Sequence, residues 1–226
     1  RRQRQMCIRD SGRAYSKYNT ETNLEYKKID EADAMLEADV GTVRRKLGIT
    51  KRKNKVVESK IKAQLFMLER EHLGNIVDGK PNSLAESGYN FFKATIDNKN
   101  VLDPATKKIA RKILSDYSTD GKVDFQKLEN SLTRAEKRYI NQISDVNKSL
   151  ANKAVYISGS LHGNQINLLN DYTHHAVLDV DGKQSDLLRK QNRFTELPST
   201  KSNTIVERTP GAKPISLDPS YSARRL

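Results

Sequence analysis

Cysteine is nearly absent from this sequence of 226 residues, in which Cys7 is the only one. A single cysteine excludes a disulfide framework within the chain and a zinc site built from thiolates. It also leaves no thiol nucleophile if residues 1–11 are not part of the natural protein. The cellular compartment stays open, because chains poor in cysteine occur in all of them.

Aromatic and apolar residues are scarce as well. The chain has no tryptophan, its hydrophobic residues make up 35% and its aromatic residues 6%, whereas 31% of its residues are charged. This composition offers little material for a large core and favours an elongated helical assembly over a compact globule. No apolar run approaches the roughly 18 residues of a membrane-spanning helix, and no signal peptide is visible.

The first eleven residues have the sequence of a translated sequencing adapter. The run from Arg1 to Asp10 matches a transposase-type adapter codon for codon, and Ser11 fits its last two bases plus one more. We therefore exclude residues 1–11 from the fold argument, as we would exclude a tag. The alternative is a genuine basic N-terminal arm. Without these four arginines and one aspartate the formal charge falls from +13 to +10, and we expect the natural protein to be longer.

Residues 12–28 are polar and unpatterned, which predicts a linker or a disordered segment.

Residues 29–102 form a predicted N-terminal helical region. A first helix, ended by Gly48, has apolar residues in steps of three and four: Ile29, Ala32, Leu36, Val40, Val43 and Leu47. A second helix starts in the basic run at Lys51, is followed by Gly74, and carries Val57, Ile61, Leu65 and Leu68 on one face.

Two helices around a turn at residues 48–50 permit two interpretations. A helix-turn-helix motif would direct seven cations toward nucleic-acid phosphates: Arg44, Arg45, Lys46, Lys51, Arg52, Lys53 and Lys55. The other interpretation is a helical hairpin whose cations only keep it in solution. We favour the hairpin, because neither helix shows a distinct base-reading face.

The pattern Ser83-Leu-Ala-Glu86 is a capping box and predicts the start of a short helix that carries Leu84, Tyr89, Phe91, Phe92 and Ile96. Because aromatic residues are rare elsewhere, we expect this helix to form the core against which its neighbours pack, rather than a base-stacking surface.

Residues 103–182 form a predicted helical core. Asp103 and Pro104 have the sequence of an N-cap and a first helical position, so they predict a helix through Tyr117. The loop that follows resembles an EF-hand, but Lys127 stands where calcium needs a bidentate glutamate. We therefore expect a turn in which Gly121 has a positive φ and Asp124 caps the next helix.

A second capping box, Thr133-Arg-Ala-Glu136, predicts the longest helix, over about residues 133–158. At 1.5 Å per residue, about 25 residues span about 38 Å. Its apolar seam consists of Leu132, Ala135, Tyr139, Ile143, Val146, Leu150, Ala154 and Ile157. A narrow seam of this kind packs against a partner helix over much of its length.

Potential metal ligands are concentrated after this helix: His162, Asp171, His174, His175, Asp179 and Asp181. Asp171, His174 and His175 would supply a site of two histidines and one carboxylate, in which a metal activates water for phosphodiester hydrolysis. Adjacent histidines, however, point about 100° apart on a helix and to opposite faces of a strand. We therefore favour half-buried histidines beside a minor β-hairpin near residues 176–188.

Residues 183–226 contain four prolines among serine, threonine, asparagine and lysine, without periodicity. This composition predicts an extended, basic C-terminal arm.

Two parts of the sequence resemble the same family. A long helix leading into Asp171-Tyr-Thr-His-His-Ala-Val177, followed by Ile205-Val-Glu-Arg-Thr-Pro-Gly211 and Ile215-Ser-Leu-Asp-Pro219, resembles segments of the very large virion-associated "polyvalent" proteins of tailed bacteriophages. These include internal proteins that leave the capsid with the DNA. The resemblance covers residues 130–226 and rests on short motifs. It implies a fragment of a giant, mainly helical phage protein, without catalysis in this stretch.

We therefore expect an all-α chain of elongated helical hairpins that acts as a non-enzymatic structural segment of a phage virion or DNA-ejection protein, in the virion or the host cytoplasm. Its partners would be other segments of its parent protein or virion proteins, bound through helix packing, with non-specific DNA nearby and no cofactor. The alternatives are a metal-dependent nuclease or hydrolase at Asp171, His174 and His175, and a helical DNA-binding module at residues 30–70.

Overall fold

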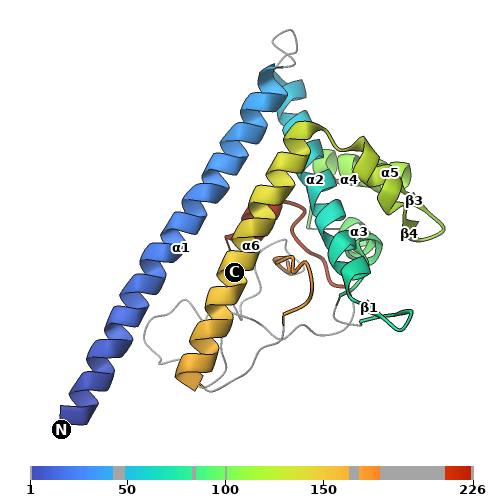
Figure 1. Cartoon of the computed structure of the whole chain (residues 1–226). Coiled ribbons are helices and arrows are strands. Elements are labelled where there is room, and N and C mark those ends of the chain that lie inside the picture. Colours follow the sequence, from blue (N-terminus) through green and yellow to red (C-terminus); the bar gives the residue numbers. More distant parts are fainter. Residues whose placement is uncertain are drawn as a thin grey trace.

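The computed structural model describes residues 2–42, 49–82, 85–99, 101–162, 168–178 and 212–224. This part of the chain contains seven helices and two short antiparallel β-hairpins, so the predicted all-α fold is confirmed. Three long helices dominate the molecule: α1 (Arg2–Thr42), α2 (Ile49–Gly74) and α6 (Arg134–His162), with shorter helices beside α2 (Figure 1). None of the described helices is both long enough and apolar enough to cross a membrane.

Helices α1 and α6 lie side by side and antiparallel (Figure 1). Ion pairs at both ends of the contact set this direction, since Lys153 pairs with Glu25 at 3.4 Å and Arg138 pairs with Asp39 at 3.7 Å. The linker predicted over residues 12–28 is wrong, because these residues belong to α1. Their few apolar side chains show no helical period, and polar contacts with α6 supply part of the stabilisation instead.

The capping box at the start of α6 is confirmed. The Thr133 amide donates to Glu136 Oε2 at 2.7 Å, and the Glu136 amide donates to Thr133 Oγ1 at 3.2 Å. The helix continues through Gly159, the predicted stop, and ends at His162. Its seam is buried as predicted at Leu132, Tyr139, Ile143, Val146 and Leu150.

Helix α2 is the centre of the fold, in contact with α1, α6 and all the shorter helices. Its middle turns are buried on every side, whereas the sequence predicted one apolar face. Two charged side chains of these turns, Lys62 and Glu69, are buried too and bind neighbouring elements. Lys62 Nζ, for example, donates to the Ser131 carbonyl at 2.7 Å and pairs with Glu136 Oε2 at 3.2 Å.

Three short helices, α3 (Gly88–Asp97), α4 (Pro104–Tyr117) and α5 (Phe125–Ser131), pack around α2. The core role predicted for Phe91 and Phe92 is confirmed by their burial. The N-cap of α3 is Ser87, four residues after the predicted Ser83, and its hydroxyl accepts from the Tyr89 amide at 3.2 Å.

Close packing of α3 on α2 requires glycine at position 88. A Cβ there would lie 3.1 Å from a Leu65 methyl group and 3.2 Å from a Glu69 carboxylate oxygen.

Helix α4 is capped by Asp103 as predicted, since its Oδ1 accepts from the amides of Ala105 and Thr106 at 3.0 Å each.

Both β-hairpins turn on Asp-Gly. Strands β1 (Ile76–Val77) and β2 (Lys80–Pro81) enclose Asp78 and Gly79, whereas β3 (Ser118–Thr119) and β4 (Lys122–Val123) enclose Asp120 and Gly121. All four turn residues have positive φ, between 51° and 79°, as a type I′ turn requires.

The conformation predicted for the EF-hand-like loop is confirmed. Gly121 has a positive φ of 79°, and Asp124 caps α5 by accepting from the Lys127 amide at 2.9 Å. The carboxylate of Asp124 therefore stabilises the first turn of the helix.

The C-terminal segment packs into the core instead of extending away from it. Ile215 is fully buried and pairs with Val177 in an antiparallel bridge, with Ser216 N donating to the Ala176 carbonyl at 2.8 Å. The short helix α8 (Pro219–Ala223) follows. The extended arm predicted over 183–226 is therefore wrong for residues 212–224, while 183–211 lie outside the described residues.

The hairpin predicted near 176–188 is also wrong for residues 176–178, the described part of this range. Val177 pairs with Ile215 rather than with a neighbouring strand, and residues 179–188 lie outside the described part. The reason is that the partner strand comes from almost forty positions further along the chain, which no local pattern reveals.

We predict that Ile215→Ala lowers the free energy of unfolding by about 2–5 kcal/mol, because it leaves a cavity in a fully buried site. Urea unfolding followed by far-ultraviolet circular dichroism measures the change. The control Lys213→Ala, at an exposed site two residues away, should change it by less than about 0.5 kcal/mol. Equal effects of the two substitutions would mean that the segment is not packed.

Two buried glutamates on this framework differ in pKa. Burial raises the pKa of Glu136, but hydrogen bonds from Thr133 and the charge of Lys62 outweigh it, so the pKa lies below the ordinary value of 4.5. At Glu69 burial prevails over hydrogen bonds from Ser87 and Gly88, and the pKa lies above 4.5. Ionised Glu136 therefore stabilises the fold above about pH 4.5, whereas ionising Glu69 costs stability as the pH rises past 4.5.

Matched Glu→Gln substitutions should therefore have opposite pH dependences. Glu136→Gln should lower the free energy of unfolding by about 3 kcal/mol at neutral pH, because it leaves buried Lys62 without its counter-ion, and the loss should shrink as the pH falls below 4.5. For Glu69→Gln, the free energy of unfolding should instead fall relative to that of wild type as the pH falls toward 4.5, because wild type gains stability as Glu69 takes up a proton. Parallel urea titrations across this range test both, and slopes of the same sign would contradict the assignment.

Candidate interaction sites

The basic run predicted to contact nucleic acid is only partly described. Arg44, Arg45 and Lys46 lie outside the described residues, and Lys51 and Arg52 belong to the first turns of α2. Lys53 is exposed, and Lys55 pairs with Glu58 one turn along at 2.9 Å. Helices α1 and α2 run in opposite directions (Figure 1), which is the arrangement of a helical hairpin. Binding of nucleic acid by this run stays a prediction.

The three predicted metal ligands point to different partners. The Asp171 carboxylate pairs with Arg70 Nε at 3.8 Å, His174 Nδ1 lies 3.2 Å from the Tyr172 hydroxyl, and the His175 ring lies 4.5 Å from the ring of Phe91. No group of three or more potential metal ligands occurs in the described part of the chain. The alternative site at Asp171, His174 and His175 is therefore not formed there. Asp179 and Asp181 lie outside that part, and His162 is the last residue of α6.

The segment that carries these histidines is fastened to the end of α2. Asn75 and Asn170 exchange hydrogen bonds, with Asn75 Nδ2 donating to the Asn170 carbonyl at 2.9 Å and the Asn170 amide donating to Asn75 Oδ1 at 3.0 Å. Thr173 Oγ1 donates to the Met67 carbonyl at 3.3 Å. The half-buried, structural role that we favoured for the histidines agrees with these contacts.

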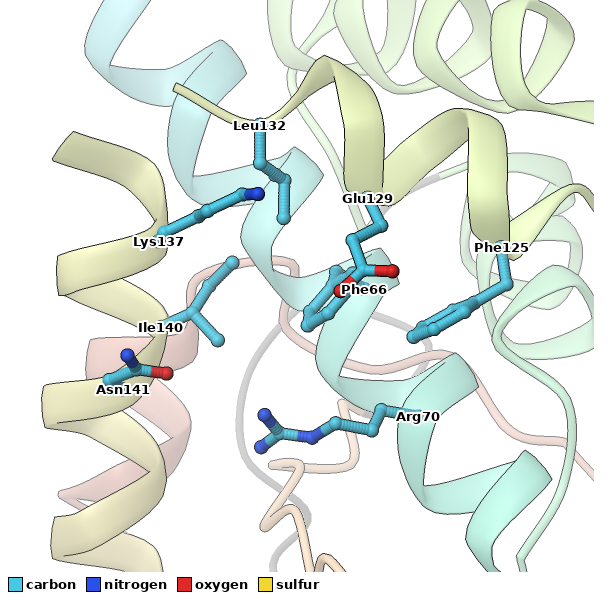
Figure 2. A pocket seen from close by; sticks show the side chains of 8 residues that line it. All are labelled: Phe66, Arg70, Phe125, Glu129, Leu132, Lys137, Ile140 and Asn141. Atoms are coloured by element: carbon cyan, nitrogen blue, oxygen red, sulfur yellow. The ribbon is translucent and has the colours of Figure 1, made fainter. Parts of the chain in front are cut away.

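A groove of about 330 Å³ opens between α2, α5 and α6 (Figure 2). Its inner surface is apolar, formed by Phe66, Phe125, Leu132 and Ile140, and the two phenylalanine rings stack with their centroids 4.9 Å apart. The volume lies at the lower end of the roughly 300–1,000 Å³ of small-molecule pockets.

Charged and polar side chains border this apolar surface. Lys137 and Asn141 extend from α6, and Glu129 extends from α5 on the other side (Figure 2). Arg70 lies over the face of Phe66, with its guanidinium carbon 5.7 Å from the ring centroid, and donates to Ser144 Oγ at 2.8 Å. The groove therefore suits an apolar group that carries charges of both signs at its edge.

Helix α4 presents a basic face to solvent. Lys108, Arg111 and Lys112 follow the spacing that puts side chains on one face, and all three are exposed. The opposite face buries Ala110 and Ile113 against the core. None of the three cations forms an ion pair within the described residues, so their charge is available to an anionic partner.

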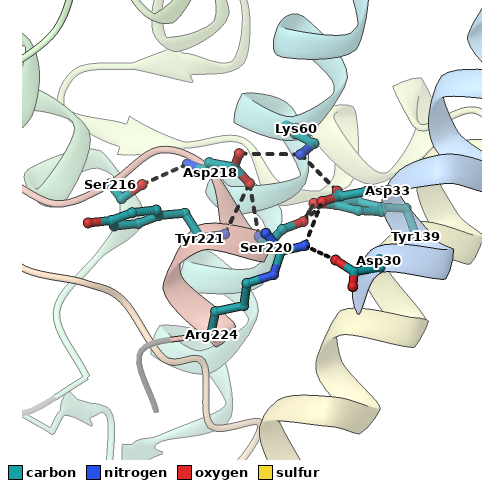
Figure 3. Close-up of polar contacts among 9 residues, drawn as sticks. All are labelled: Asp30, Asp33, Lys60, Tyr139, Ser216, Asp218, Ser220, Tyr221 and Arg224. Atoms are coloured by element: carbon teal, nitrogen blue, oxygen red, sulfur yellow. Dashed lines mark hydrogen bonds and ion pairs between the residues drawn. The ribbon is translucent and has the colours of Figure 1, made fainter. Parts of the chain in front are cut away.

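A partly buried polar network joins the C-terminal segment to three helices (Figure 3). Lys60 of α2 pairs with Asp33 of α1 at 2.7 Å and with Asp218 at 3.3 Å. Asp218 also caps α8, because its Oδ1 accepts from the Ser220 amide at 2.9 Å. Arg224 pairs with Asp30 and with Asp33.

Tyr139 of α6 completes this network. Its hydroxyl lies 2.5 Å from Ser220 Oγ, and Ser220 Oγ donates to Asp33 Oδ1 at 2.6 Å. Burial, together with the negative charges of Asp218 and Asp33, raises the pKa of Tyr139 well above its ordinary value. The tyrosine therefore keeps its proton. Since the Ser220 hydroxyl donates its proton to Asp33, the Tyr139 hydroxyl is the donor in its hydrogen bond with Ser220.

The sequence contained one unused signal for this region. Asp218-Pro219 repeats the pattern of Asp103-Pro104, an N-cap followed by proline at the first helical position, and it would have predicted α8. The groove and the network themselves combine residues far apart in the chain. No spacing pattern could have found them.

No protein-family model matches this chain, and neither do any of the curated proteins or solved structures compared with it.

Proposed function

We propose that this chain is a non-enzymatic structural segment of a large virion or DNA-ejection protein, which packs on neighbouring segments through its helices and lies against nucleic-acid backbone. The observation that carries the nucleic-acid part is the outward face of α4, where Lys108, Arg111 and Lys112 are exposed and form no ion pairs within the described part. Contacts of this kind to phosphates are independent of sequence.

The charge of α4 is one-sided. Between its N-cap Asp103 and Asp116 in its last turn, every charged residue is a cation, and Lys107, which donates to the Asn98 carbonyl at 3.0 Å, adds a fourth beside the exposed three. A rigid helix holds such cations at fixed spacing, so they bind a polyanion without first being ordered. The formal charge of +10 that remains without residues 1–11 acts in the same direction.

The structural role is supported by where the buried ionisable groups lie. Lys60 joins α1 to the C-terminal segment, Lys62 joins α2 to the start of α6, and Tyr139 joins α6 to α8. In each case the contact links elements distant in sequence, so these groups serve the packing of helices.

Two of the segments on which the phage resemblance rests are neighbours in space. Val177 and Ile215 pair, and the Ala176 amide donates to Ser222 Oγ at 3.2 Å. Residues 171–177 and 215–219 thus belong to one packed unit. This supports the resemblance, because two of its short motifs lie together in space.

Replacing Lys108, Arg111 and Lys112 by alanine should weaken binding to duplex DNA at low salt, with little change in the free energy of unfolding because all three are exposed. Each phosphate contact contributes about 0.9 to the slope of log K against log salt, so the slope should fall by up to about 2.7. Fluorescence anisotropy with two unrelated duplexes across a salt series measures it, and both duplexes should give the same slope.

The matched control is a triple alanine variant at Lys93, Lys99 and Lys127, which removes the same charge from exposed positions in α3, in the loop after it and in α5. It should reduce the slope by less than the α4 variant does. A chain that binds no duplex DNA at low salt would refute the nucleic-acid part of the proposal. Equal slopes for the two triple variants would refute the role of α4.

A further inference from the structure

We infer that the β1–β2 hairpin of one copy of this chain binds in the groove between α2, α5 and α6 of a second copy. The inference rests on the structural role proposed above and names a partner and a surface for it. It concerns neither the α4 cations nor nucleic acid, so that either proposal can fail alone.

The hairpin and the end of α2 before it expose large apolar side chains. Leu73, Ile76 and Val77 are 41%, 42% and 67% exposed, and they account for three of the six exposed large hydrophobic side chains in the described part. Three such residues within five positions are unusual, because exposed apolar residues ordinarily occur singly. The hairpin projects from the end of α2, away from the long helices (Figure 1).

The hairpin is rigidly placed. Its turn consists of only two residues, Asp78 and Gly79. At its base, Asn75 Nδ2 donates to the Glu71 carbonyl at 2.7 Å and to the Asn170 carbonyl. A short hairpin fixed in this way projects its apolar side chains away from its own helices. The hairpin can therefore enter the groove of another molecule.

The groove complements the hairpin in polarity. Phe66, Leu132 and Ile140 line its base, and they offer apolar surface to the side chain of Val77, the more exposed of the two β1 residues. A branched aliphatic side chain that enters the groove leaves water on both surfaces at once, which stabilises the contact in proportion to the apolar area removed from water.

The charges at the edges are complementary too. Lys137 and Glu129 lie on opposite sides of the groove (Figure 2), and Asp78 and Lys80 lie in and beside the hairpin turn. None of these four side chains forms an ion pair within the described residues. Asp78 can therefore pair with Lys137 and Lys80 with Glu129 of the second copy, and this arrangement fixes the orientation of the hairpin in the groove.

Because the hairpin and the groove are different surfaces, the contact is heterologous, and each copy keeps a free hairpin or a free groove for the next. The product is an open row or a ring of copies. Six hairpin residues bury less than the roughly 1,200–2,000 Å² of stable complexes, so each contact should be weak, and repetition along the row should strengthen the assembly.

Sedimentation velocity of the full chain, without nucleic acid and over a concentration series up to the millimolar range, tests the inference. Wild type should associate as concentration rises. Lys137→Glu and Asp78→Lys should each weaken association by at least about tenfold, since each places like charges together. The double variant with both reversals in one chain should regain association, because every contact then has a matched pair again.

Two controls separate this contact from a general loss of charge or of apolar surface. Lys148→Glu, at another exposed position of α6, should leave association unchanged, as should Leu24→Asp on α1, whereas Val77→Asp should abolish it. A wild-type chain that stays monomeric throughout would overturn the inference. So would a double variant that associates no better than its parents.

Discussion

Lys60 ties the C-terminal segment to the long helices α1 and α2, because its charge neutralises two carboxylates that are far apart in the chain. Asp33 and Asp218 are almost two hundred residues apart, yet both lie within 3.3 Å of the same ammonium group. Lys60 and Asp33 are largely buried, and charges in such surroundings stabilise only when they are paired and hydrogen-bonded. Ser220 donates to Asp33, and Tyr139 donates to Ser220. The network therefore fixes α1, α2, α6 and the C-terminal segment relative to one another.

Fixing those elements also forms the surfaces on which the proposed functions rest. With α2 enclosed by its neighbours, α4 turns one face inward at Ala110 and Ile113 and presents its cations outward. The same packing sets α5 and α6 apart by the width of the groove and holds Phe66 against Phe125. Interaction surfaces of this kind follow from a rigid core, since a flexible scaffold would not keep cations or apolar side chains at constant spacing.

Local signals predicted the local structure well. Thr133 and Glu136 marked the start of α6, Asp103 capped α4, and Gly121 with Asp124 shaped the turn before α5, because each depends on residues within four positions. The failures concern long-range partners. Ile215 sits in a segment too short to show a period, and its burial is supplied by helices elsewhere in the chain. Asp171, His174 and His175 were candidate ligands by spacing, but Arg70, Tyr172 and Phe91, which they contact in space, set their actual surroundings.

Amide hydrogen exchange of residues 212–224 tests most directly whether the C-terminal segment is part of the core. The Ile215 amide donates to Thr95 Oγ1 at 2.9 Å and the Ser216 amide to the Ala176 carbonyl at 2.8 Å, so both should exchange as slowly as the buried amides of α6. In Lys60→Met, exchange should accelerate more in this segment than in α6. Exchange of these amides at the rate of an unstructured peptide would contradict the account.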